Sequence, residues 1–323
     1  MRFLIRLDDF LYQKIREIYT KVHKQRETHK DLYLSTLADR EYKVLWRSSN
    51  TIQSKICYFS SYDRDSIVDD YVFHYLKELK NNKFDIIFIS TSPLIRNEDI
   101  EYLNKLTFAV IHRVNFGLDF FSWKIALREF PYTDDTQRVL FANDSVYGPV
   151  YSLKPYLEKM EEQKLDMVGF TESWEMAYHV QSYFLYCKER LLRSGILKEF
   201  FSTVNVISDK MEVIRRYELG LSRVLTSKGI QIGGLIGYKE LAITQSPEKN
   251  GCDFLIEKYL YNPCIGYWWK ILNDRYTPFF KKSVVAFLEG DCIDFIVALS
   301  RILTKTDVIL DLDFVINNLK RNN

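Results

Sequence analysis

The chain lacks any apolar run of membrane-spanning length, and no signal peptide precedes its first folded segment. A helix that crosses a membrane needs about 20 apolar residues, so the sequence predicts no membrane span and a cytoplasmic location. The glycine-based signatures of serine hydrolases, P-loop enzymes and dinucleotide-binding enzymes are also missing. GGLIG at residues 233–237 lacks a strand–turn–helix setting for a phosphate, so it predicts a turn or a tight strand contact.

Cysteine is scarce, and charge of one sign is not in excess. No two of the five cysteines have C-x-x-C spacing, so neither a zinc site nor an oxidising compartment is required. Cys57 lies inside an apolar run and is expected to be a core residue. The 45 Lys and Arg nearly balance the 43 Asp and Glu, which argues against a nucleic-acid partner. The cysteines are Cys57, Cys187, Cys252, Cys264 and Cys292.

The sequence does contain short apolar runs that each end in polar residues. Residues 55–59, 84–90, 108–113 and 139–142 are predicted to be buried strands. A predicted helix, 66–79, separates the first two and has Ser66 as its expected N-cap. Strands that alternate with helices predict an α/β fold with a mostly parallel, doubly wound sheet and helices on both faces. The polar ends at residues 62–65, 90–92, 113–115 and 143–145 are then expected to meet in one crevice.

VLFANDSVYGP, residues 139–149, is the most informative of these runs. The apolar VLFA gives way to Asn143, Asp144 and Ser145 before Gly148 and Pro149 break the strand. Open α/β sheets bind their ligands at the carboxyl ends of central strands, where this carboxylate is expected. The same residue types also form turns, so a plain exit from the strand is the alternative.

Four longer motifs resemble one known family. HRVNFGLDFFSWKIAL, FANDSVYGP, TESWEMAYHVQSYFL and YELGLSRVL are similar to the rhamnan-synthesis F family of glycosyltransferases, which build rhamnose-containing bacterial polysaccharides and O-antigens. The resemblance covers roughly residues 55–281. It implies a GT-A-type, Rossmann-like fold that binds a nucleotide sugar. It further implies transfer of L-rhamnose from dTDP-L-rhamnose, with inversion, to a glycan or a lipid-linked glycan.

Glycosyl transfer requires that the charge on the leaving diphosphate be neutralised by a divalent metal or by basic side chains. Asp144 is the expected ligand of Mg²⁺ or Mn²⁺, because a carboxylate oxygen suits a hard cation. GT-A enzymes usually offer two acids here, as D-x-D, whereas Asn143 and Ser145 flank the single acid of this chain. Lys124 or Arg113 is the alternative partner of the diphosphate.

A second group of candidate donor ligands follows the strand that ends at Arg113. Gly117 allows a tight turn, and Asp119 is placed to cap the helix FFSWKIAL. Asn115 and Asp119 also suit the hydroxyls and edges of a nucleoside, and the resemblance favours this donor-binding role. The full predicted donor set is Tyr62, Asp63, Arg113, Asn115, Asp119, Lys124, Asn143, Asp144 and Ser145.

An inverting transfer also needs a general base for the acceptor hydroxyl. Glu218 is the first choice, because it opens the predicted helix YELGLSRVLTSKG. The helix dipole alone also favours an acid in a first helical turn. Glu172 and Glu175, in TESWE after a predicted strand, are its rivals, and Glu172 is closer to the strand end. His179 is the third candidate.

HVQSYFLYC, residues 179–187, alternates as one strand. This pattern puts His179, Gln181 and Tyr183 on one face, which we expect, together with Glu175, to contact the sugar or the acceptor. His179 is also a candidate metal ligand, although a single histidine is more often structural.

No linker rich in glycine, serine or proline divides the chain. We predict a helical N-terminal extension over residues 1–50, a nucleotide-sugar-binding domain over 51–253, and a helical, aromatic-rich C-terminal extension over 254–323. FLYQKIREIYTKVHKQR predicts a basic amphipathic helix that either docks on the main domain or lies on the inner face of the cell membrane. The C-terminal aromatics predict core or homodimer packing, with a membrane or partner contact as the alternative.

Two other functions remain open on the sequence alone. The chain could use another nucleotide sugar, or it could be a catalytically weak nucleotide-sugar-binding scaffold subunit of a polysaccharide assembly complex. The single acid between Asn143 and Ser145 is what leaves the second alternative open. Turnover of a donor in the presence of an acceptor distinguishes the two.

Overall fold

The computed structural model describes residues 28–237, 262–287 and 292–322. Its centre is a nine-stranded sheet with the order β1-β4-β3-β2-β5-β9-β7-β10, and β8 pairs with β7 off this path. A second, two-stranded sheet joins β11 to β6. The strands are β1 Tyr42–Arg47, β2 Lys55–Ser61, β3 Asp85–Ser90, β4 Ala109–Arg113, β5 Arg138–Asn143, β6 Val146–Tyr147, β7 Met167–Ser173, β8 His179–Val180, β9 Phe184–Lys188, β10 Ile232–Ile236 and β11 Phe280–Lys281.

The strands β4, β3, β2 and β5 run parallel to one another, as the alternation of strands and helices predicts. The other pairings are antiparallel, except that β10 runs parallel to β7. The predicted α/β class is therefore confirmed, with the parallel strands in the half of the sheet that carries the donor motifs. The helices are α2 Asp70–Asn81, α3 Asn97–Leu106, α4 Leu118–Glu129, α5 Lys154–Glu162, α6 Glu189–Arg193, α7 Ile196–Ser202, α8 Lys210–Val213, the π-helical turn η1 Ile214–Glu218, α9 Leu219–Ser227, α12 Pro263–Gly266, α13 Trp268–Asn273, α14 Lys282–Phe287, α15 Cys292–Leu303 and α16 Leu312–Asn322.

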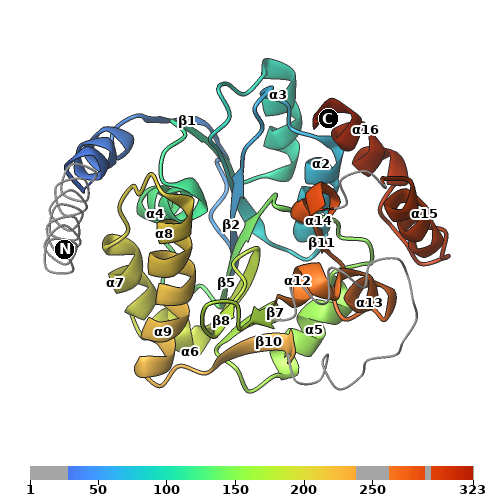
Figure 1. Ribbon diagram of the computed structural model, residues 1–323. Helices are drawn as coiled ribbons and strands as arrows, with labels where there is room; N and C mark the ends of the chain where they lie inside the picture. Colours follow the sequence, from blue (N-terminus) through green and yellow to red (C-terminus); the bar gives the residue numbers. More distant parts are fainter. Residues whose placement is uncertain (1–27, 238–261, 288–291, 323) are drawn as a thin grey trace, which may run out of the picture.

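Helices cover both faces of the sheet, with α4, α7, α8 and α9 on one side and α2, α5, α12 and α13 on the other (Figure 1). Strand β2 explains this layering. Its residues Cys57 and Phe59 face the core under α2 and α5, whereas Ile56 and Tyr58 face the core under α4 and α7. Successive strand residues point to opposite faces, so a strand that is apolar throughout is buried on both sides.

Two expectations about small residues are confirmed. Cys57 is completely buried, and its thiol is free. Gly234, from the GGLIG run, lies in β10 against β7. A Cβ atom there would lie 2.7 Å from the carbonyl oxygen of Ile236 and 2.9 Å from the amide nitrogen of Glu172. GGLIG therefore serves close strand packing.

The helix α2 begins at Asp70 rather than at the predicted Ser66. Ser66 has a φ of 62°, and its hydroxyl accepts a hydrogen bond from the amide of Leu94 (3.2 Å). Asp69 occupies the N-cap position but makes no capping bond. Its carboxylate instead accepts hydrogen bonds from Asn318 and Arg321. Tertiary contacts therefore override the local capping pattern.

The segment predicted as a helical N-terminal extension also contains a strand. Residues 28–38 are helical, and β1 then adds to the sheet antiparallel to β4. The helix docks through Ser35, whose hydroxyl accepts from the amide of Val206 (2.8 Å). FLYQKIREIYTKVHKQR lies outside the described residues, so its docking or membrane role stays a prediction. Among the described helices, none is long and apolar enough to span a membrane.

The described C-terminal part is mainly helical but also contains the strand β11, and its aromatic residues pack into the main core. Tyr267, Trp268, Phe279 and Phe280 are all buried there. The described C-terminal aromatics therefore support core packing.

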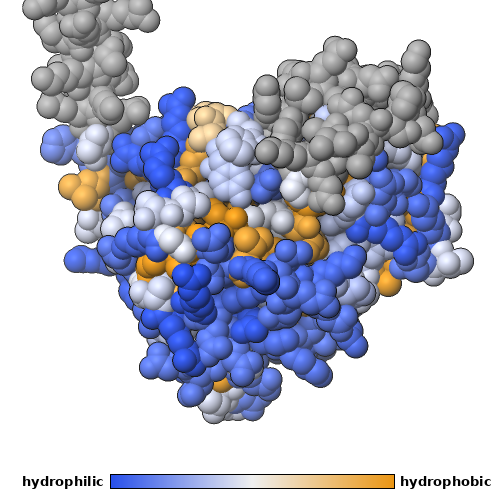
Figure 2. All heavy atoms as spheres, turned by 90° about the horizontal axis from the view of Figure 1, so that it is seen from below, coloured by the Kyte–Doolittle hydropathy of each residue, from blue (hydrophilic) through white to orange (hydrophobic). Residues whose placement is uncertain are grey.

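Seen from below, the molecule gathers hydrophobic residues in a hollow near the centre of this face, with hydrophilic residues around them (Figure 2).

Candidate active site

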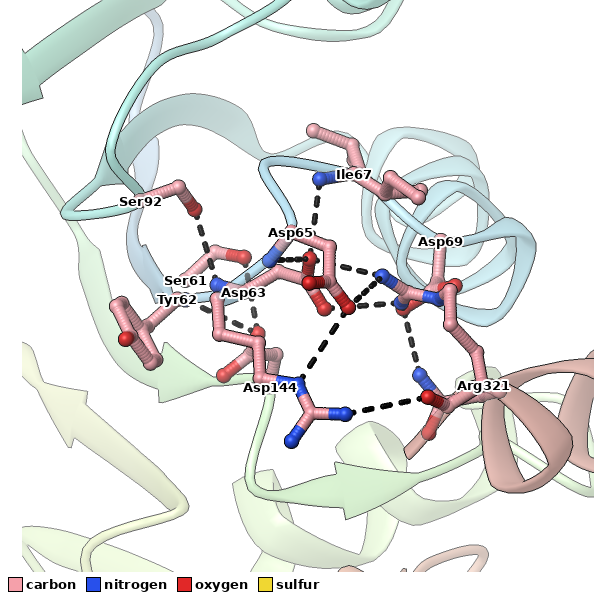
Figure 3. Close-up of polar contacts among 12 residues, drawn as sticks. Ser61, Tyr62, Asp63, Asp65, Ile67, Asp69, Ser92, Asp144 and Arg321 are labelled. Atoms are coloured by element: carbon pink, nitrogen blue, oxygen red, sulfur yellow. Dashed lines mark hydrogen bonds and ion pairs between the residues drawn. The ribbon is translucent and has the colours of Figure 1, made fainter. Parts of the chain in front are cut away.

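Asp144 lies directly after β5, at the carboxyl edge of the parallel strands. Its Oδ2 accepts hydrogen bonds from the hydroxyl of Ser61 (2.9 Å) and from the backbone amide of Tyr62 (3.1 Å). Both donors come from the end of β2 and the loop that follows it (Figure 3). The predicted meeting of polar strand ends thus occurs here.

Asp119 places a second carboxylate beside Asp144. Its Oδ2 accepts a hydrogen bond from the side-chain amide of Asn143 (3.0 Å), and Asn143 Oδ1 accepts from the hydroxyl of Ser145 (2.6 Å). Burial raises the pKa of Asp119 to about 6, opposed by a hydrogen bond from Ser60 and reinforced by the charge of Asp144. The second acid of this site thus comes from α4 and not from the N-D-S motif.

The structure corrects the capping role predicted for Asp119. The N-cap of α4 is Gly117, with a φ of 77° and no side-chain capping bond. A Cβ atom at this glycine would lie 2.8 Å from Cβ of Phe121, so both the backbone conformation and the space favour glycine here. The Asp119 carboxylate is therefore left to face Asn143 and Asp144.

Arg113 has a different role from the predicted diphosphate contact. Its buried guanidinium donates to the hydroxyl of Ser122 and to the carbonyl oxygens of Val114, Phe116 and Leu118, over 2.7–3.1 Å. These contacts use all five N–H groups of the side chain. Burial lowers the pKa of Arg113 to about 9, opposed by the charge of Asp119. Arg113 therefore fixes the loop that presents Asp119.

A cavity of about 640 Å³ opens beside this loop, at the ends of β2, β3 and β4. Tyr62, Ser92, His112 and Asn115 line it, together with residues 40–43 in and before β1. Tyr62 is 45% exposed, so part of this residue is accessible to a ligand. Cavities of about 300–1,000 Å³ hold small-molecule ligands in proteins.

Two other predicted donor ligands, Asp63 and Lys124, contact other groups of the protein. The carboxylate of Asp63 is held by Arg321, at 2.9 Å. The ammonium of Lys124 donates to the carbonyl oxygen of Val204 (2.7 Å) and lies 3.8 Å from Asp39. Protein groups hold Lys124 in this structure, so its diphosphate contact stays a prediction, and Asp63 acts within its own loop.

Glu218 is partly buried, and its charge raises the pKa of Asp119. The Glu218 carboxylate is therefore close enough to Asp119 for the two charges to interact. The amide of Ser182 donates to its Oε1 (2.8 Å). The helix α9 begins at Leu219, directly after Glu218, which agrees with the predicted start. It continues α8 and η1 without a break, so Glu218 is the last residue of the π-helical turn. Such π-helical turns occur frequently at functional sites.

The rivals of Glu218 have other partners. Glu172 accepts a hydrogen bond from the hydroxyl of Tyr178 (3.1 Å), and Glu175 accepts from the side-chain amide of Asn262 (2.7 Å). His179 is 5% exposed, and its Nδ1 lies 2.8 Å from the carbonyl oxygen of Ala177. Within the described ranges, no group of three or more His, Cys, Asp or Glu residues is arranged to hold a metal ion.

Gln181 and Tyr183 are buried and contact protein rather than open space. Gln181 Oε1 accepts from the hydroxyl of Thr171 (2.8 Å), and the hydroxyls of Tyr183 and Thr171 lie 3.2 Å apart. Cys264, from α12, joins the same group. The single strand predicted over 179–187 is wrong, since β8 and β9 are separate there. Both side chains therefore anchor α12 on the sheet, and the predicted sugar contact is not available to them.

Two lysines beside the site, Lys281 and Lys282, were not predicted from the sequence. Lys281 lies opposite Val146 in the β11–β6 pair, and the amide of Lys282 donates to the carbonyl oxygen of Ser145 (3.0 Å). The Lys281 ammonium lies 5.3 Å from the centre of the Tyr183 ring. Neither lysine forms an ion pair with another described residue. The only signal was a Lys-Lys pair within an aromatic-rich segment, far along the chain from Asp144.

A model of the family described as "Rhamnan synthesis protein F" matches residues 86–321, more than half of the chain. The chain belongs to this family. Among curated proteins it is similar to "Virulence protein VirA" of Vibrio anguillarum, at 30% identity over 61% of this chain and 62% of that protein. It is also similar to the "Uncharacterized protein y4gN" of Sinorhizobium fredii, at 22% identity over 53% of this chain and 45% of that protein. The chain therefore spans less than two thirds of the length of these relatives.

Solved structures with a similar course of the chain include two glycosyltransferases. One is the glycosyltransferase GlyE of Streptococcus pneumoniae, with a TM-score of 0.42 and 11% identity over 84% of this chain and 64% of that one. The other is the mannosyltransferase PcManGT of Pyrobaculum calidifontis, in complex with GDP-Man and Mn²⁺, with a TM-score of 0.37 and 10% identity. That match covers 93% of this chain and 89% of the other. Both TM-scores are low, so the structural likeness is loose.

Proposed function

We propose that this chain is an inverting glycosyltransferase that moves L-rhamnose from dTDP-L-rhamnose to a growing cell-surface polysaccharide. The observation that carries the proposal is the pairing of Asp119 with Asp144 at the carboxyl edge of the parallel strands, next to a cavity of about 640 Å³. Membership of the rhamnan synthesis protein F family supports a rhamnose donor. A glycan or a lipid-linked glycan is the proposed acceptor.

The nucleoside of the donor is proposed to occupy the cavity at the ends of β2, β3 and β4. The exposed ring of Tyr62 offers a stacking surface for the base, and Asn115 and Ser92 offer polar groups for its edge and the ribose. The diphosphate then lies near Asp144. Lys281 and Lys282 are proposed to neutralise part of its charge, since the end of β11 and the start of α14 hold them next to Ser145 and Val146.

A divalent cation fits the Asp119–Asp144 pair. Mg²⁺ is commonly held by one or two carboxylates and keeps waters and substrate phosphates as its other ligands. Two carboxylates whose charges interact, one of them with its pKa raised to about 6, gain stability when a cation neutralises them. When bound there, Mg²⁺ or Mn²⁺ would stabilise the charge of the leaving diphosphate.

Glu218 is proposed to be the general base that takes the proton of the acceptor hydroxyl. The amide of Ser182 fixes one of its oxygens, and the charge of the carboxylate acts on Asp119. An inverting transfer needs such a base on the side of the sugar opposite the leaving group. Glu172 is the second choice, because the hydroxyl of Tyr178 holds its carboxylate.

A thermal-shift panel of nucleotide sugars, with and without Mg²⁺ or Mn²⁺, tests the donor site. A donor present at 100 times its dissociation constant stabilises the folded state by about 2.7 kcal/mol. We expect dTDP-L-rhamnose to raise the melting temperature and UDP-hexoses to leave it unchanged. Stabilisation by a UDP-sugar alone would rule out the rhamnose donor. Binding without turnover would favour a scaffold subunit, and no response to any nucleotide sugar would contradict the proposal.

A further inference from the structure

The last turn of α16 reaches back to the loop between β2 and α2 (Figure 3). The Nη1 and Nη2 atoms of Arg321 donate to Oδ1 and Oδ2 of Asp63, both at 2.9 Å. Nη2 also donates to Oδ2 of Asp69 (2.6 Å). The three side chains are 22%, 11% and 14% exposed, so the contact is largely shielded from water. A bidentate, charge-assisted contact of this kind fixes geometry as well as adding energy.

Asp63, which Arg321 holds, also forms hydrogen bonds within its own loop. Its Oδ1 accepts hydrogen bonds from the amides of Asp65 (2.9 Å) and Ile67 (3.1 Å). Its own amide donates to the hydroxyl of Ser92 (2.9 Å) at the end of β3. Burial alone would raise the pKa of Asp63, but the hydrogen bonds from Arg321 and from the loop amides hold it below its usual value. Asp63 is therefore ionised at neutral pH.

Asp63, the residue that Arg321 holds, lies directly next to a residue of the candidate site. Tyr62 precedes Asp63, and its amide donates to Oδ2 of Asp144 (3.1 Å). Tyr62 and Ser92, the neighbours of Asp63 in sequence and in space, both line the cavity of about 640 Å³. A shift of Asp63 would thus move a wall of the cavity and remove a hydrogen bond from Asp144.

Asn318, one turn before Arg321, makes a second connection. Its side-chain amide donates to Oδ2 of Asp69 (2.6 Å), and its Oδ1 accepts from the hydroxyl of Tyr147 (2.5 Å). Tyr147 lies in β6, three residues after Asp144. The helix α16 therefore holds the backbone on both sides of Asp144, from the loop after β2 and from β6.

We infer that Arg321 is a positioning residue for the donor site. By holding Asp63, it fixes the loop of residues 61–69, and through Tyr62 it fixes the carboxylate of Asp144 and one wall of the cavity. This inference rests on the proposed function for its consequence in donor binding. Its structural part, the ordering of the loop, stands independently of that function.

Two variants of the full chain test this role. Arg321→Gln removes both the guanidinium and its charge, and Arg321→Lys removes the guanidinium but keeps the charge. Lysine has no planar fork for bidentate pairing, so both variants lose the grip on Asp63. Arg275→Gln is the matched control, because Arg275 pairs with Asp307 (2.8 Å) elsewhere in the C-terminal part. Amide hydrogen exchange over residues 61–69 and calorimetry with dTDP-L-rhamnose are measured on all four proteins.

We expect faster exchange at the amides of Asp65 and Ile67 in both Arg321 variants, with Arg275→Gln unchanged. Affinity for dTDP-L-rhamnose should fall about tenfold in Arg321→Gln, the order of one lost charge-assisted hydrogen bond. Unchanged exchange in the loop, or a loosened loop with unchanged donor affinity, would overturn the inference. If the wild-type protein bound no dTDP-L-rhamnose, the proposed donor would be wrong, and the exchange data would still decide whether Arg321 orders the loop.

Discussion

At the scale of single residues, the candidate site depends on two carboxylates that lie 25 positions apart, Asp119 and Asp144. Asn143 links them, because its amide donates to Asp119 while the chain turns directly into Asp144. Arg113 fixes the loop before Asp119, and Ser61 and Tyr62 fix Asp144. Each carboxylate therefore has its own support from buried polar groups.

Replacing Asp144 with asparagine should abolish sugar transfer and leave the fold intact. The carboxylate is at the edge of the sheet, where it contacts Ser61 and Tyr62 rather than the apolar core. The amide keeps one acceptor oxygen for these donors but removes the charge. Transfer rate and melting temperature are compared with those of Asp134→Asn, an exposed acid outside the site. Near-normal activity of Asp144→Asn would remove this residue from the mechanism.

Asp119 should make stability depend on pH. Its pKa is about 6 in the folded protein and about 4 in an unfolded chain, so the folded state binds the extra proton between these values. The free energy of unfolding should therefore fall as pH rises from about 4 to about 6 and stay lower above that. The Asp119→Asn variant lacks the titrating carboxyl group and its contribution to the free energy of unfolding. It should therefore gain stability relative to the wild type as pH rises.

Urea unfolding of both proteins in EDTA, at pH 4 and pH 7.5, measures the Asp119 effect without a bound cation. The stability difference between variant and wild type should change in favour of the variant at the higher pH. Parallel pH profiles for the two proteins would contradict the raised pKa of Asp119 and its cause.

Glu218→Gln should slow transfer by about 10²–10⁴, the usual contribution of a general base. Donor affinity should stay nearly unchanged, because the base acts on the acceptor. The amide keeps an oxygen that can accept from Ser182, so packing is preserved. Glu172→Gln is the comparison for the same assay. If Glu218→Gln were fully active and Glu172→Gln inactive, the role of base would pass to Glu172.

At the scale of secondary-structure elements, the loop between β4 and α4 is the most constrained part of the site. Arg113→Gln would leave the carbonyl oxygens of Val114, Phe116 and Leu118 without their buried donor. Each buried polar group left unsatisfied costs about 1–3 kcal/mol, so we expect a loss of more than 2 kcal/mol, about the cost of two such groups. Urea unfolding measures it.

Arg128→Gln is the control for this loop variant. Arg128 lies on α4, the helix that follows this loop, and pairs with Asp39 at the surface. A surface pair contributes about 0–1 kcal/mol, so this change should be nearly neutral. Equal losses from Arg113→Gln and Arg128→Gln would contradict the structural role of the buried guanidinium.

The elements that the sequence predicted well are those with strong local patterns. The strands that end near Ser61, Ser90, Arg113 and Asn143 have apolar central residues and polar ends, and parallel pairing brings these ends together. The start of α2 was misplaced, because Asp69 bonds a side chain of α16 instead of capping its own helix. No local signal encodes a partner so distant in the chain.

The same limit explains the residues that were missed or misassigned. Lys281 and Lys282 reach the site through the pairing of β11 with β6, which no pattern within either segment specifies. Arg113 and Lys124 were chosen for their charge, but charge alone does not reveal that protein carbonyl groups already hold their donors. The π-helical turn before Glu218 likewise has no simple periodicity.

At the scale of the whole molecule, the C-terminal part completes the half of the sheet that carries the candidate donor site. The main core contains residues of α2 together with Trp268, Phe279 and Phe280. The helix α16 packs against α2 and holds the loop after β2 through Arg321. The predicted division at residues 253 and 254 therefore separates segments that share one core.

The most direct test of the central claim is the transfer reaction itself, followed by NMR. Purified protein is incubated with dTDP-L-rhamnose, Mn²⁺ and a rhamnose-containing acceptor, with Asp144→Asn as the inactive control. We predict release of dTDP together with a new anomeric signal of inverted configuration relative to the donor, and neither in the control. Intact donor after prolonged incubation, or a product with retained configuration, would contradict the account.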